Sequence, residues 1–347
     1  MSTPAVALDR VSIVFGQTPA AALSLMDEGR SREEIQEATG QILGVHDASL
    51  TVGSGEIVVL MGLSGSGKST LIRAVNGLNP VVRGTVQIFD GDRGIEVTGA
   101  TARTLRRLRR ERVAMVFQQF ALLPWRTVLE NVALGLELRG AGRAAREAAA
   151  REQLALVGLT DWADRQVQEL SGGMQQRVGL ARAFATEAPV LLMDEPFSAL
   201  DPLIRTKLQD ELLAFQAQMG RTILFVSHDL DEAMKIGNRI AIMEGGRIVQ
   251  LGTPQEIVLA PATAYVAEFV AHMNPLNVLD ARAVMVAGEP VPADAPTVGP
   301  ATPVRELLAM QAEGASAIAV VADGAAIGLV TPRSLARALL DLAEARA

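Results

Sequence analysis

Cysteine is absent from the 347-residue sequence, and histidine occurs only three times. The absence of cysteine excludes disulfides, cysteine-ligated zinc and catalysis by a thiol. Three histidines do not favour a histidine-rich metal site. The net charge of −7 argues against a protein that binds nucleic acid or anionic lipid, so we expect no nucleic-acid partner.

Long hydrophobic runs are also missing. The longest apolar stretches, such as APVLLM and EIVVLMG, are much shorter than the roughly 20 residues that cross a bilayer. The first ten residues, MSTPAVALDR, lack a basic region followed by an apolar core, so they predict no secretory signal. We therefore expect a cytoplasmic protein that would work at a membrane only through partners.

Apolar residues are nevertheless plentiful enough for a large core. They make up 49% of the chain and charged residues 20%, which is typical of a folded globular protein and unlike a disordered one. The length exceeds that of one average domain, so we expect one large domain and one small one.

A glycine-rich stretch follows a short apolar run near residue 60. The run GEIVVLMG (55–62) predicts a buried strand, and a helix is expected from Ser69-Thr70 until Asn79-Pro80 breaks it. The stretch between them has the pattern G-x-x-x-x-G-K-S, and this context predicts a P-loop in preference to an ordinary glycine-rich turn. The predicted phosphate-binding residues are Gly62, Leu63, Ser64, Gly65, Ser66, Gly67, Lys68, Ser69 and Thr70.

Each residue type in this loop suits the phosphates of a nucleotide. Gly62, Gly65 and Gly67 let the backbone turn its N–H groups toward phosphate, and the helix N-terminus adds a partial positive charge. Lys68 would reach the β- and γ-phosphates, and Ser69 would ligate Mg²⁺.

Two further apolar runs end in polar residues. APVLLMDEP (188–196) ends in Asp194 and Glu195, and RTILFVSH (221–228) ends in His228. Because ligands of an open parallel sheet bind beyond the carboxyl ends of its strands, these endings predict one shared crevice. Asp194 would hold Mg²⁺, Glu195 would act as a general base, and His228 would contact the γ-phosphate. The alternatives are a surface Asp-Glu pair and a structural histidine.

The stretch ELSGGMQQRVGLARAFA (169–185) forms a second glycine-rich site that contains no lysine. Ser171 is the expected N-cap of a helix whose exposed N–H groups would hold an anion. Two phosphate sites with one lysine make sense if the second site completes a nucleotide that is bound elsewhere. A symmetric dimer provides that arrangement.

These motifs resemble those of the ATP-binding subunits of ABC transporters. LSGGMQQR (170–177) is similar to the signature motif of that family, and its order relative to the P-loop and VLLMDEP matches. The resemblance covers roughly residues 6–270 and implies ATP and Mg²⁺ as cofactors in a head-to-tail homodimer. Each ATP would lie between the P-loop of one copy and four residues of the other, namely Ser171, Gly172, Gly173 and Gln175.

Three other residues take their expected roles from this resemblance alone. Gln118 in MVFQQF matches the glutamine that senses Mg²⁺ and the attacking water, and Asp201 in SALD matches the aspartate that communicates across the dimer. Phe15 in SIVFG matches the aromatic residue that stacks on adenine, with a core aromatic as the alternative. The implied Mg²⁺ ligands are Ser69, Gln118 and Asp194.

Two domains are expected. Residues 1–275 would form an ABC-type nucleotide-binding domain, an α/β P-loop NTPase fold with a mainly parallel core sheet. Within it we expect an insertion at 18–44 and a helical subdomain at about 120–175. In the insertion, Ser31-x-x-Glu34 predicts a capping box that opens a short helix, which Gly40 closes.

Residues 276–347 resemble a single CBS motif. The stretch 302–340 predicts helix, strand, Asp-Gly turn, strand and helix, with ARAVM (281–285) as the lead-in. CBS motifs usually work in pairs, so the second subunit could supply the other motif. Ser334 stands where many nucleotide-binding CBS motifs have an aspartate, which argues against an adenosine ligand.

Two surface stretches bear on partners. FALLPWRTVLENVALGLEL (120–138) is apolar around Pro124-Trp125 and suits a surface that receives a membrane partner, although a subdomain packing only on itself is the alternative. RTLRRLRRER (103–112) predicts a solvated helix in preference to a nucleic-acid site, because Leu105 and Leu108 recur at helical spacing.

The resemblance extends to a particular group of ATPase subunits, those that drive the uptake of quaternary amines. It is carried by the insertion, the P-loop region and FALLPWRTV, and it is strongest for the ATPase subunits of choline importers. We expect the ATP-hydrolysing subunit of an importer for choline, glycine betaine or proline betaine. It would sit peripherally on the cytoplasmic face of the inner membrane, with transmembrane permease subunits and an external (periplasmic) substrate-binding protein. The main alternative is a soluble ABC ATPase with a mechanical role, and the signature motif argues against a small-molecule kinase.

The charge of the C-terminal region yields a first prediction. After Pro275 the chain has five arginines, no lysine and eight acidic residues, so it lacks the cationic surface that would sense salt through anionic lipid. We expect truncation after His272 to weaken dimerisation and to leave the salt dependence of transport-coupled ATPase activity in anionic vesicles unchanged. A truncated transporter that lost its salt response would contradict this.

Overall fold

The computed structural model describes residues 3–344 except 119–120, 199, 272, 275, 277 and 293. Its contacts divide the chain into two compact units. Unit 1 contains residues 1–228 and 241–248, and unit 2 contains residues 229–240 and 249–347. The expected domain boundary at 275/276 and the expected bounds of the helical subdomain stay predictions.

The first sheet has four strands in the order β2-β1-β4-β5, and its neighbouring strands are antiparallel. Residues of β2 alternate between buried and exposed over much of its length, whereas β1 has a continuous buried run from Val11 to Val14. Its strands are β1 (Pro4–Phe15), β2 (Ile42–Gly53), β4 (Arg83–Asp90) and β5 (Arg93–Glu96).

The second sheet has six strands in the order β10-β9-β3-β8-β7-β6, and the pairs β3-β8, β8-β7 and β7-β6 are parallel. Every residue of β3, β7 and β8 is buried, which explains why these strands are continuous apolar runs in the sequence. The three predicted strands are therefore confirmed. The bounds are β3 (Ile57–Met61), β6 (Val113–Val116), β7 (Val190–Asp194), β8 (Thr222–Val226), β9 (Arg239–Glu244) and β10 (Arg247–Gly252).

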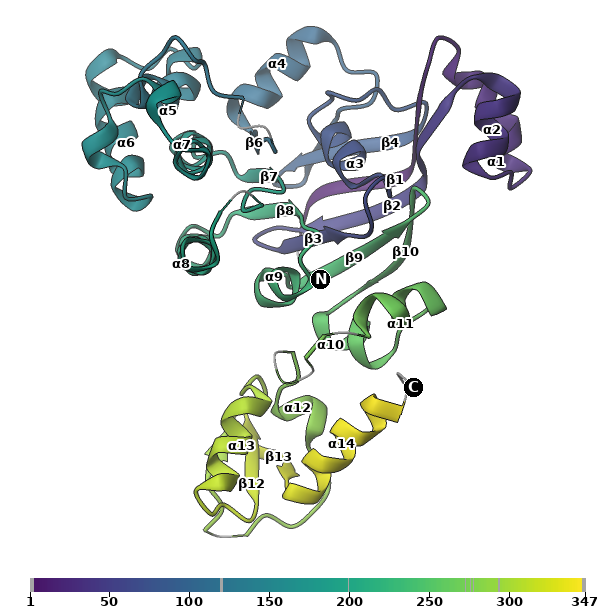
Figure 1. Cartoon of the computed structure of the whole chain (residues 1–347), viewed down its shortest axis with the longest axis vertical. Helices are drawn as coiled ribbons and strands as arrows, with labels where there is room; N and C mark the ends of the chain where they lie inside the picture. The colour runs from purple at the N-terminus through teal and green to yellow at the C-terminus, as the bar shows by residue number, and fades with distance from the viewer. Residues whose placement is uncertain are drawn as a thin grey trace. The chain divides into compact units, whose positions relative to one another are not determined.

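Helix α3 (Lys68–Val75) follows the P-loop and packs between the two sheets, where it contacts β1, β2 and β4 on one side and β7 and β8 on the other (Figure 1). The expectation that this helix would continue to Asn79-Pro80 was wrong. The helix ends at Asn76 because Gly77 adopts a φ of 68°, and the N–H of Leu78 bonds back to the carbonyl of Arg73.

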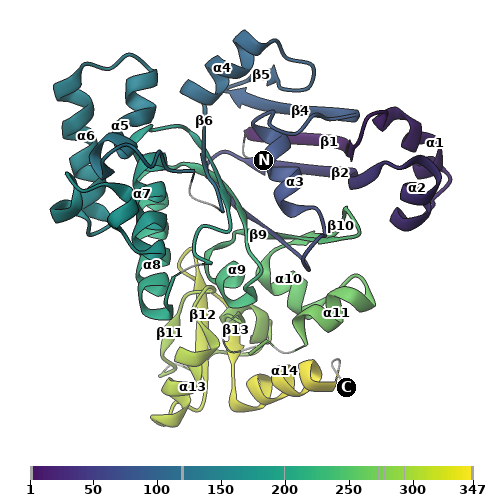
Figure 2. The ribbon, with the colours of Figure 1, turned by 45° about the horizontal axis from the view of Figure 1, so that its top comes forward.

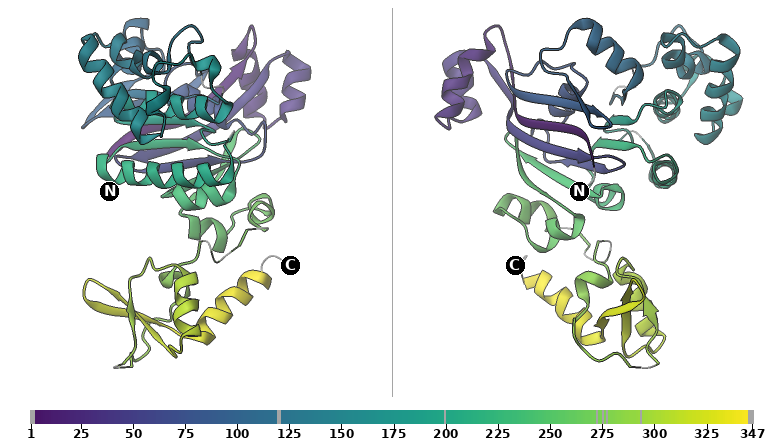
Figure 3. Two further views of the ribbon diagram at one scale, coloured as in Figure 1. Left: turned by 60° about the vertical axis from the view of Figure 1, so that its left-hand side comes forward. Right: turned by 180° about the vertical axis from the view of Figure 1, so that it is seen from behind.

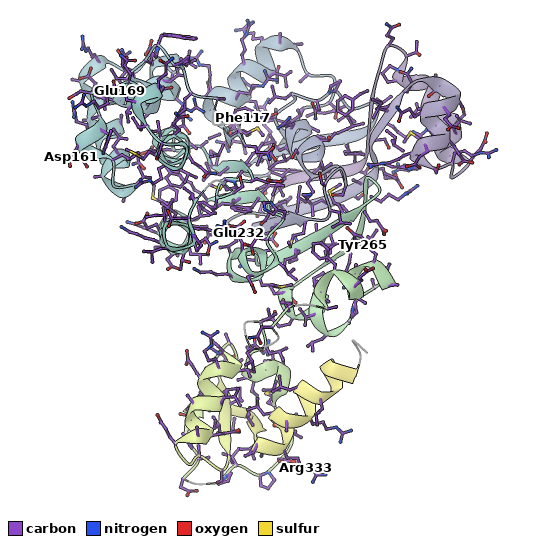
Figure 4. The ribbon with its side chains drawn as sticks, viewed as in Figure 1. Phe117, Asp161, Glu169, Glu232, Tyr265 and Arg333 are labelled. Atoms are coloured by element: carbon purple, nitrogen blue, oxygen red, sulfur yellow. The ribbon has the colours of Figure 1, made fainter. Side chains whose placement is uncertain are left out.

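A helical region follows β6. Figure 2 shows α5, α6 and α7 grouped on the side of the cassette opposite to α1 and α2. Its helices share a core of their own that includes Val132, Leu154 and Val178, and Asp161 and Glu169 lie in its connecting turns (Figure 4). The bounds are α5 (Val128–Leu138), α6 (Arg143–Leu156), η2 (Thr160–Trp162), η3 (Val167–Glu169), α7 (Gly172–Ala185) and α8 (Pro202–Met219).

The insertion between β1 and β2 folds as η1 (Pro19–Ala22), α1 (Leu23–Asp27) and α2 (Arg32–Thr39). The predicted capping box is confirmed, because Ser31 accepts from the N–H of Glu34 and Glu34 accepts from the N–H of Ser31. Gly40 ends the helix with a φ of 68°. The predicted helix at 103–112 is also confirmed, as α4 (Ala102–Glu111), with Leu108 buried.

Unit 2 contains a small sheet in the order β11-β12-β13, flanked by helices (Figure 3). The predicted helix-strand-turn-strand-helix order is confirmed, and Asp323 and Gly324 both take a positive φ in the turn, as a two-residue hairpin requires. The bounds are α9 (Leu230–Ile236), α10 (Pro254–Leu259), α11 (Ala264–Val270), α12 (Ala281–Val284), β11 (Thr297–Val298), α13 (Val304–Ala312), β12 (Ile318–Ala322), β13 (Ala325–Val330) and α14 (Pro332–Glu344). Among the described residues, no helix combines the length and the apolar character needed to cross a membrane.

Candidate nucleotide-binding site

A cleft of about 800 Å³ lies at the carboxyl ends of β3, β7 and β8 in unit 1. This is the shared crevice that the three strand endings predicted. Ten of the predicted residues line it: Phe15, Ser64, Gly65, Gly67, Lys68, Ser69, Thr70, Gln118, Glu195 and His228. The structure therefore brings together the P-loop, residues that follow β6, β7 and β8, and the aromatic residue at the end of β1.

Glycine is required at two points where the P-loop approaches other backbone. A Cβ on Gly62, which has a φ of 141°, would lie 2.2 Å from the carbonyl oxygen of Met243. A Cβ on Gly67, which has a φ of 104°, would lie 2.6 Å from the carbonyl oxygen of Gly44. Side chains at either position would push the loop away from its neighbours and change the shape of the cradle.

Lys68 carries the positive charge of the cradle. Its Nζ donates to the carbonyl oxygens of Gly62, at 2.7 Å, and Leu63, at 3.0 Å. Burial lowers the pKa of this ammonium, and the nearby carboxylates of Glu195 and Asp194 oppose that shift. An anion bound in the cleft would act in the same direction as these carboxylates and would favour the charged ammonium.

Asp194 is fully buried at the end of β7, and each of its carboxylate oxygens has a polar partner. Its Oδ1 accepts from the hydroxyl of Ser69 at 2.7 Å, and its Oδ2 pairs with Nη2 of Arg73 at 2.8 Å. A buried carboxylate needs such partners, because an unpaired charge is costly away from water. Arg73 was missed in the sequence, although its position four residues after Ser69 on α3 places both on one helix face.

The oxygens of Ser69 and Asp194 fit a hard cation such as Mg²⁺, which prefers oxygen ligands and completes its shell with water and phosphate. Within the described residues no group of three or more His, Asp or Glu side chains gathers to hold a metal by itself. An ion at this position would therefore depend on the phosphates of a bound nucleotide, whose negative charge it would neutralise.

Glu195 contacts the other two predicted catalytic residues, Gln118 and His228. Its Oε2 accepts from Nε2 of Gln118 at 3.1 Å and lies 3.3 Å from Nδ1 of His228. The residue has a φ of 50°, and its N–H donates to the carbonyl oxygen of Val226, which ties this strained turn to β8. A carboxylate held by an amide and an imidazole beside a P-loop is suited to accept a proton from water.

The signature residues lie outside the cleft. Ser171 caps α7 by accepting from the N–H of Met174, as predicted, and Gln175 donates to the carbonyl oxygens of Val167 and Leu170. None of the four predicted signature residues lines the cleft, and neither does Asp201, which caps α8. Gly62, Leu63 and Ser66 of the P-loop are also outside the cleft lining.

Helix α2 of the insertion contributes three cleft residues that the sequence did not predict, namely Arg32, Glu33 and Gln36. Sequence reasoning found the capping box of α2, but nothing in the sequence indicated that this helix faces the P-loop. At the same end of the cleft, Phe15 is 37% exposed, and its ring lies 2.8 Å from the position that a Cβ on Gly44 would take. Phe15 is thus accessible to a ligand and is not a core residue.

A buried parallel sheet, a P-loop that opens a helix, and an acid pair after the neighbouring strand define a P-loop NTPase cassette. The comparisons agree with this class. A family model described as "ABC transporter" matches residues 45–198. The chain is 30% identical to a solved dimeric bacterial ABC transporter cassette, with a TM-score of 0.62, covering 72% of this chain and 98% of that one.

Named relatives are more similar. The glycine betaine/proline betaine transport system ATP-binding protein ProV of Escherichia coli is 52% identical over 78% of this chain and 66% of that protein, so the match spans about two thirds of its length. A glycine betaine transport ATP-binding protein of Bacillus subtilis is 48% identical over 83% of this chain and 68% of that protein. A trimethylamine N-oxide transport system ATP-binding protein of Ruegeria pomeroyi is 46% identical over 83% of each chain. The chain belongs to the ABC transporter family of ATP-binding proteins.

Replacing Glu195 with glutamine tests its predicted role as the base. We expect Glu195→Gln to keep ATP binding, because the amide keeps the shape of the carboxylate, and to slow hydrolysis by roughly 10²–10⁴. An ATP-bound dimer should accumulate. Lys68→Ala serves as the comparison, since it removes charge pairing in the ground state and should weaken ATP binding as well. The measurements are turnover, nucleotide affinity and size in ATP and Mg²⁺, and a protein that stays monomeric would contradict the prediction.

Proposed function

We propose that this chain is the ATP-hydrolysing subunit of an ABC importer for a small quaternary or methylated amine. The observation that carries the proposal is the identity of 46–52% with relatives named for glycine betaine, proline betaine and trimethylamine N-oxide transport. The cleft lined by the P-loop and Glu195, with the buried Asp194 bonded to Ser69 behind it, supports the hydrolytic part of the proposal.

In the proposed reaction, Lys68 and the backbone of the P-loop hold the phosphates of ATP. Glu195 accepts a proton from the water that attacks the γ-phosphate, while Gln118 and His228 orient the carboxylate from either side. Asp194 and Ser69 are the proposed Mg²⁺ ligands from β7 and α3, with Gln118 as the third. Phe15 would stack on the adenine ring at the open end of the cleft.

The complete site would form only in a homodimer. Ser171 and Gly172 are exposed at the N-terminus of α7, away from the cleft of their own chain, so they are free to complete the cleft of a second copy. The similar solved structure, a dimeric bacterial ABC transporter cassette, supports this assembly. The lysine that Ser171, Gly172, Gly173 and Gln175 lack would then come from the other subunit, and Asp201 would communicate across the interface.

Partners outside the dimer are proposed from the surface and from the named transport systems of the relatives. Trp125, which is 72% exposed beside Pro124, offers an apolar contact for a transmembrane permease subunit. An external, periplasmic substrate-binding protein would deliver the amine, and the chain would lie peripherally on the cytoplasmic face of the inner membrane.

The identity of the amine rests on resemblance and relatives, because the residues of the nucleotide cleft belong to the ATP side of the reaction. The sequence resemblance favours choline, while the relatives are named for betaines and trimethylamine N-oxide. These solutes share a methylated nitrogen, and we propose that class with choline as a member. We also propose that residues 276–347 form a CBS-like domain that contributes subunit pairing and binds no adenosine ligand. There the hydroxyl of Ser334 bonds to the carbonyl oxygen of Thr331.

Reconstitution tests the proposed function directly. The chain is assembled with its permease in vesicles, and ATP hydrolysis is measured with binding protein loaded with choline, glycine betaine or trimethylamine N-oxide. We expect at least one of these to stimulate hydrolysis above the level with empty binding protein. Hydrolysis that no permease or amine alters would instead favour a soluble ATPase with a mechanical role.

Mixing two inactive variants tests the composite site. Ser171→Arg and Lys68→Ala chains are mixed so that mixed dimers form. In each mixed dimer one nucleotide site carries both changes, and the other is intact, because each site takes its P-loop from one chain and its signature from the other. We expect the mixture to hydrolyse ATP faster than either variant alone. Mixed dimers no more active than the parents would show that the sites act within one chain or cannot work singly.

A further inference from the structure

Arg32, the first residue of α2, reaches from the insertion to the P-loop. Its Nη1 donates to the carbonyl oxygen of Gly65 at 2.8 Å, and its Nη2 donates to the carbonyl oxygen of Gly44 at 2.7 Å. One planar guanidinium thus joins the phosphate cradle to β2. The same side chain lines the nucleotide cleft beside Lys68.

The surroundings of Arg32 do not supply the partners that a half-buried cation usually has. Among the described residues the carboxylate of Glu33 attracts its charge without forming a direct ion pair, and its buried Nε has no hydrogen-bond partner. Burial lowers the pKa of this guanidinium. Removing a guanidinium from water costs free energy when no direct ion pair compensates for the lost hydration. For Arg32, that cost is offset by its two hydrogen bonds to the carbonyl oxygens of Gly65 and Gly44.

The insertion holds Arg32 in place from behind. Asp27, at the end of α1, forms a two-pronged ion pair with Arg83 of β4, with N–O distances of 2.5 and 2.9 Å. Ile35 of α2 is fully buried in a small core with Met26 and Val14. The capping box fixes the first turn of α2, where Arg32 lies. The guanidinium is therefore presented from an anchored helix.

Gly65 is the part of the P-loop that gains most from such a contact. Its φ is 79°, and a Cβ added there would meet nothing within 4 Å, so side-chain packing does not hold this residue. A glycine in open space is conformationally free, and ordering it when a phosphate binds costs entropy. A bond from Arg32 to its carbonyl oxygen reduces that freedom before the ligand arrives.

We propose that Arg32 is a positioning residue of the nucleotide site, which fastens the P-loop at Gly65 to β2 at Gly44 and so preorganises the phosphate cradle. This inference rests on the proposed function, since it assumes that the cleft binds ATP. It assigns to the insertion a role in phosphate binding. Because Arg32 acts through the P-loop backbone and not through the base, every ligand that fills the cradle should depend on it equally.

The experiment compares two matched changes in the full-length protein. Arg32→Met removes the guanidinium at the P-loop, and Arg30→Met makes the same change two residues earlier, where the exposed side chain only pairs with Glu28 and Glu34. Dissociation constants are measured for ATP, GTP and inorganic tripolyphosphate, which has no base. Thermal unfolding without nucleotide and steady-state hydrolysis are recorded for each protein.

We expect Arg32→Met to raise the dissociation constants of all three ligands by a similar factor of about tenfold, as the loss of charge-assisted hydrogen bonds implies. The KM for ATP should rise while kcat stays within about twofold, because binding is lost uniformly. Arg30→Met should match the unchanged protein. Arg32→Lys should fall between the two, since an ammonium can replace one bond but lacks the planar fork.

Three results would overturn the inference. Equal affinities of Arg32→Met and the unchanged protein would show that the contact does not preorganise the cradle. A loss for ATP with none for tripolyphosphate would show that α2 recognises the base. A lower unfolding temperature without any change in affinity would show that Arg32 only stabilises the insertion. Failure of the unchanged protein to bind any of the ligands would instead contradict the proposed function itself.

Discussion

The buried carboxylate of Asp194 is the interaction on which the site depends. It joins β7 to α3 through Ser69 and Arg73, and so fixes the distance between the P-loop helix and the strand that presents Glu195. Because both partners come from α3, any shift of that helix would leave a charge uncompensated in the core. The packing of α3 between the two sheets therefore has an electrostatic constraint as well as a hydrophobic one.

The central features of the site could be predicted from the sequence because they follow from local chemistry. Fully buried strands are continuous apolar runs, their endings mark one crevice, and Gly62 and Gly67 mark close backbone approaches. The end of α3 was missed because Gly77 was not recognised as the residue whose positive φ stops the helix. Arg32 was missed for a different reason, since its contacts join residues far apart in the chain and follow no sequence period.

The two glycine-rich motifs differ in what surrounds them. The P-loop has Lys68 and lines the nucleotide cleft, whereas the signature stretch has no lysine and does not line that cleft. Ser171 accepts a hydrogen bond from the N–H of Met174, and Gln175 donates to the carbonyl oxygens of Val167 and Leu170 in the turn before the helix. Ser171 and Gly172 are exposed at this helix start. In the proposed dimer, this helix N-terminus would face the phosphates that are held by the P-loop of the other chain.

The insertion and the helical region occupy opposite sides of the cassette, and each would govern a different step of nucleotide use. On the insertion side, the proposed roles of Arg32, through the P-loop backbone, and of Phe15, on adenine, need only one chain, so their effect would fall on the affinity of the monomer. On the helical side, Ser171 and Trp125 are exposed, and their proposed roles require other chains. Binding can then precede assembly, and hydrolysis can wait for the dimer. A transporter requires that order, because ATP consumed before the permease and both cassettes are engaged would do no transport work.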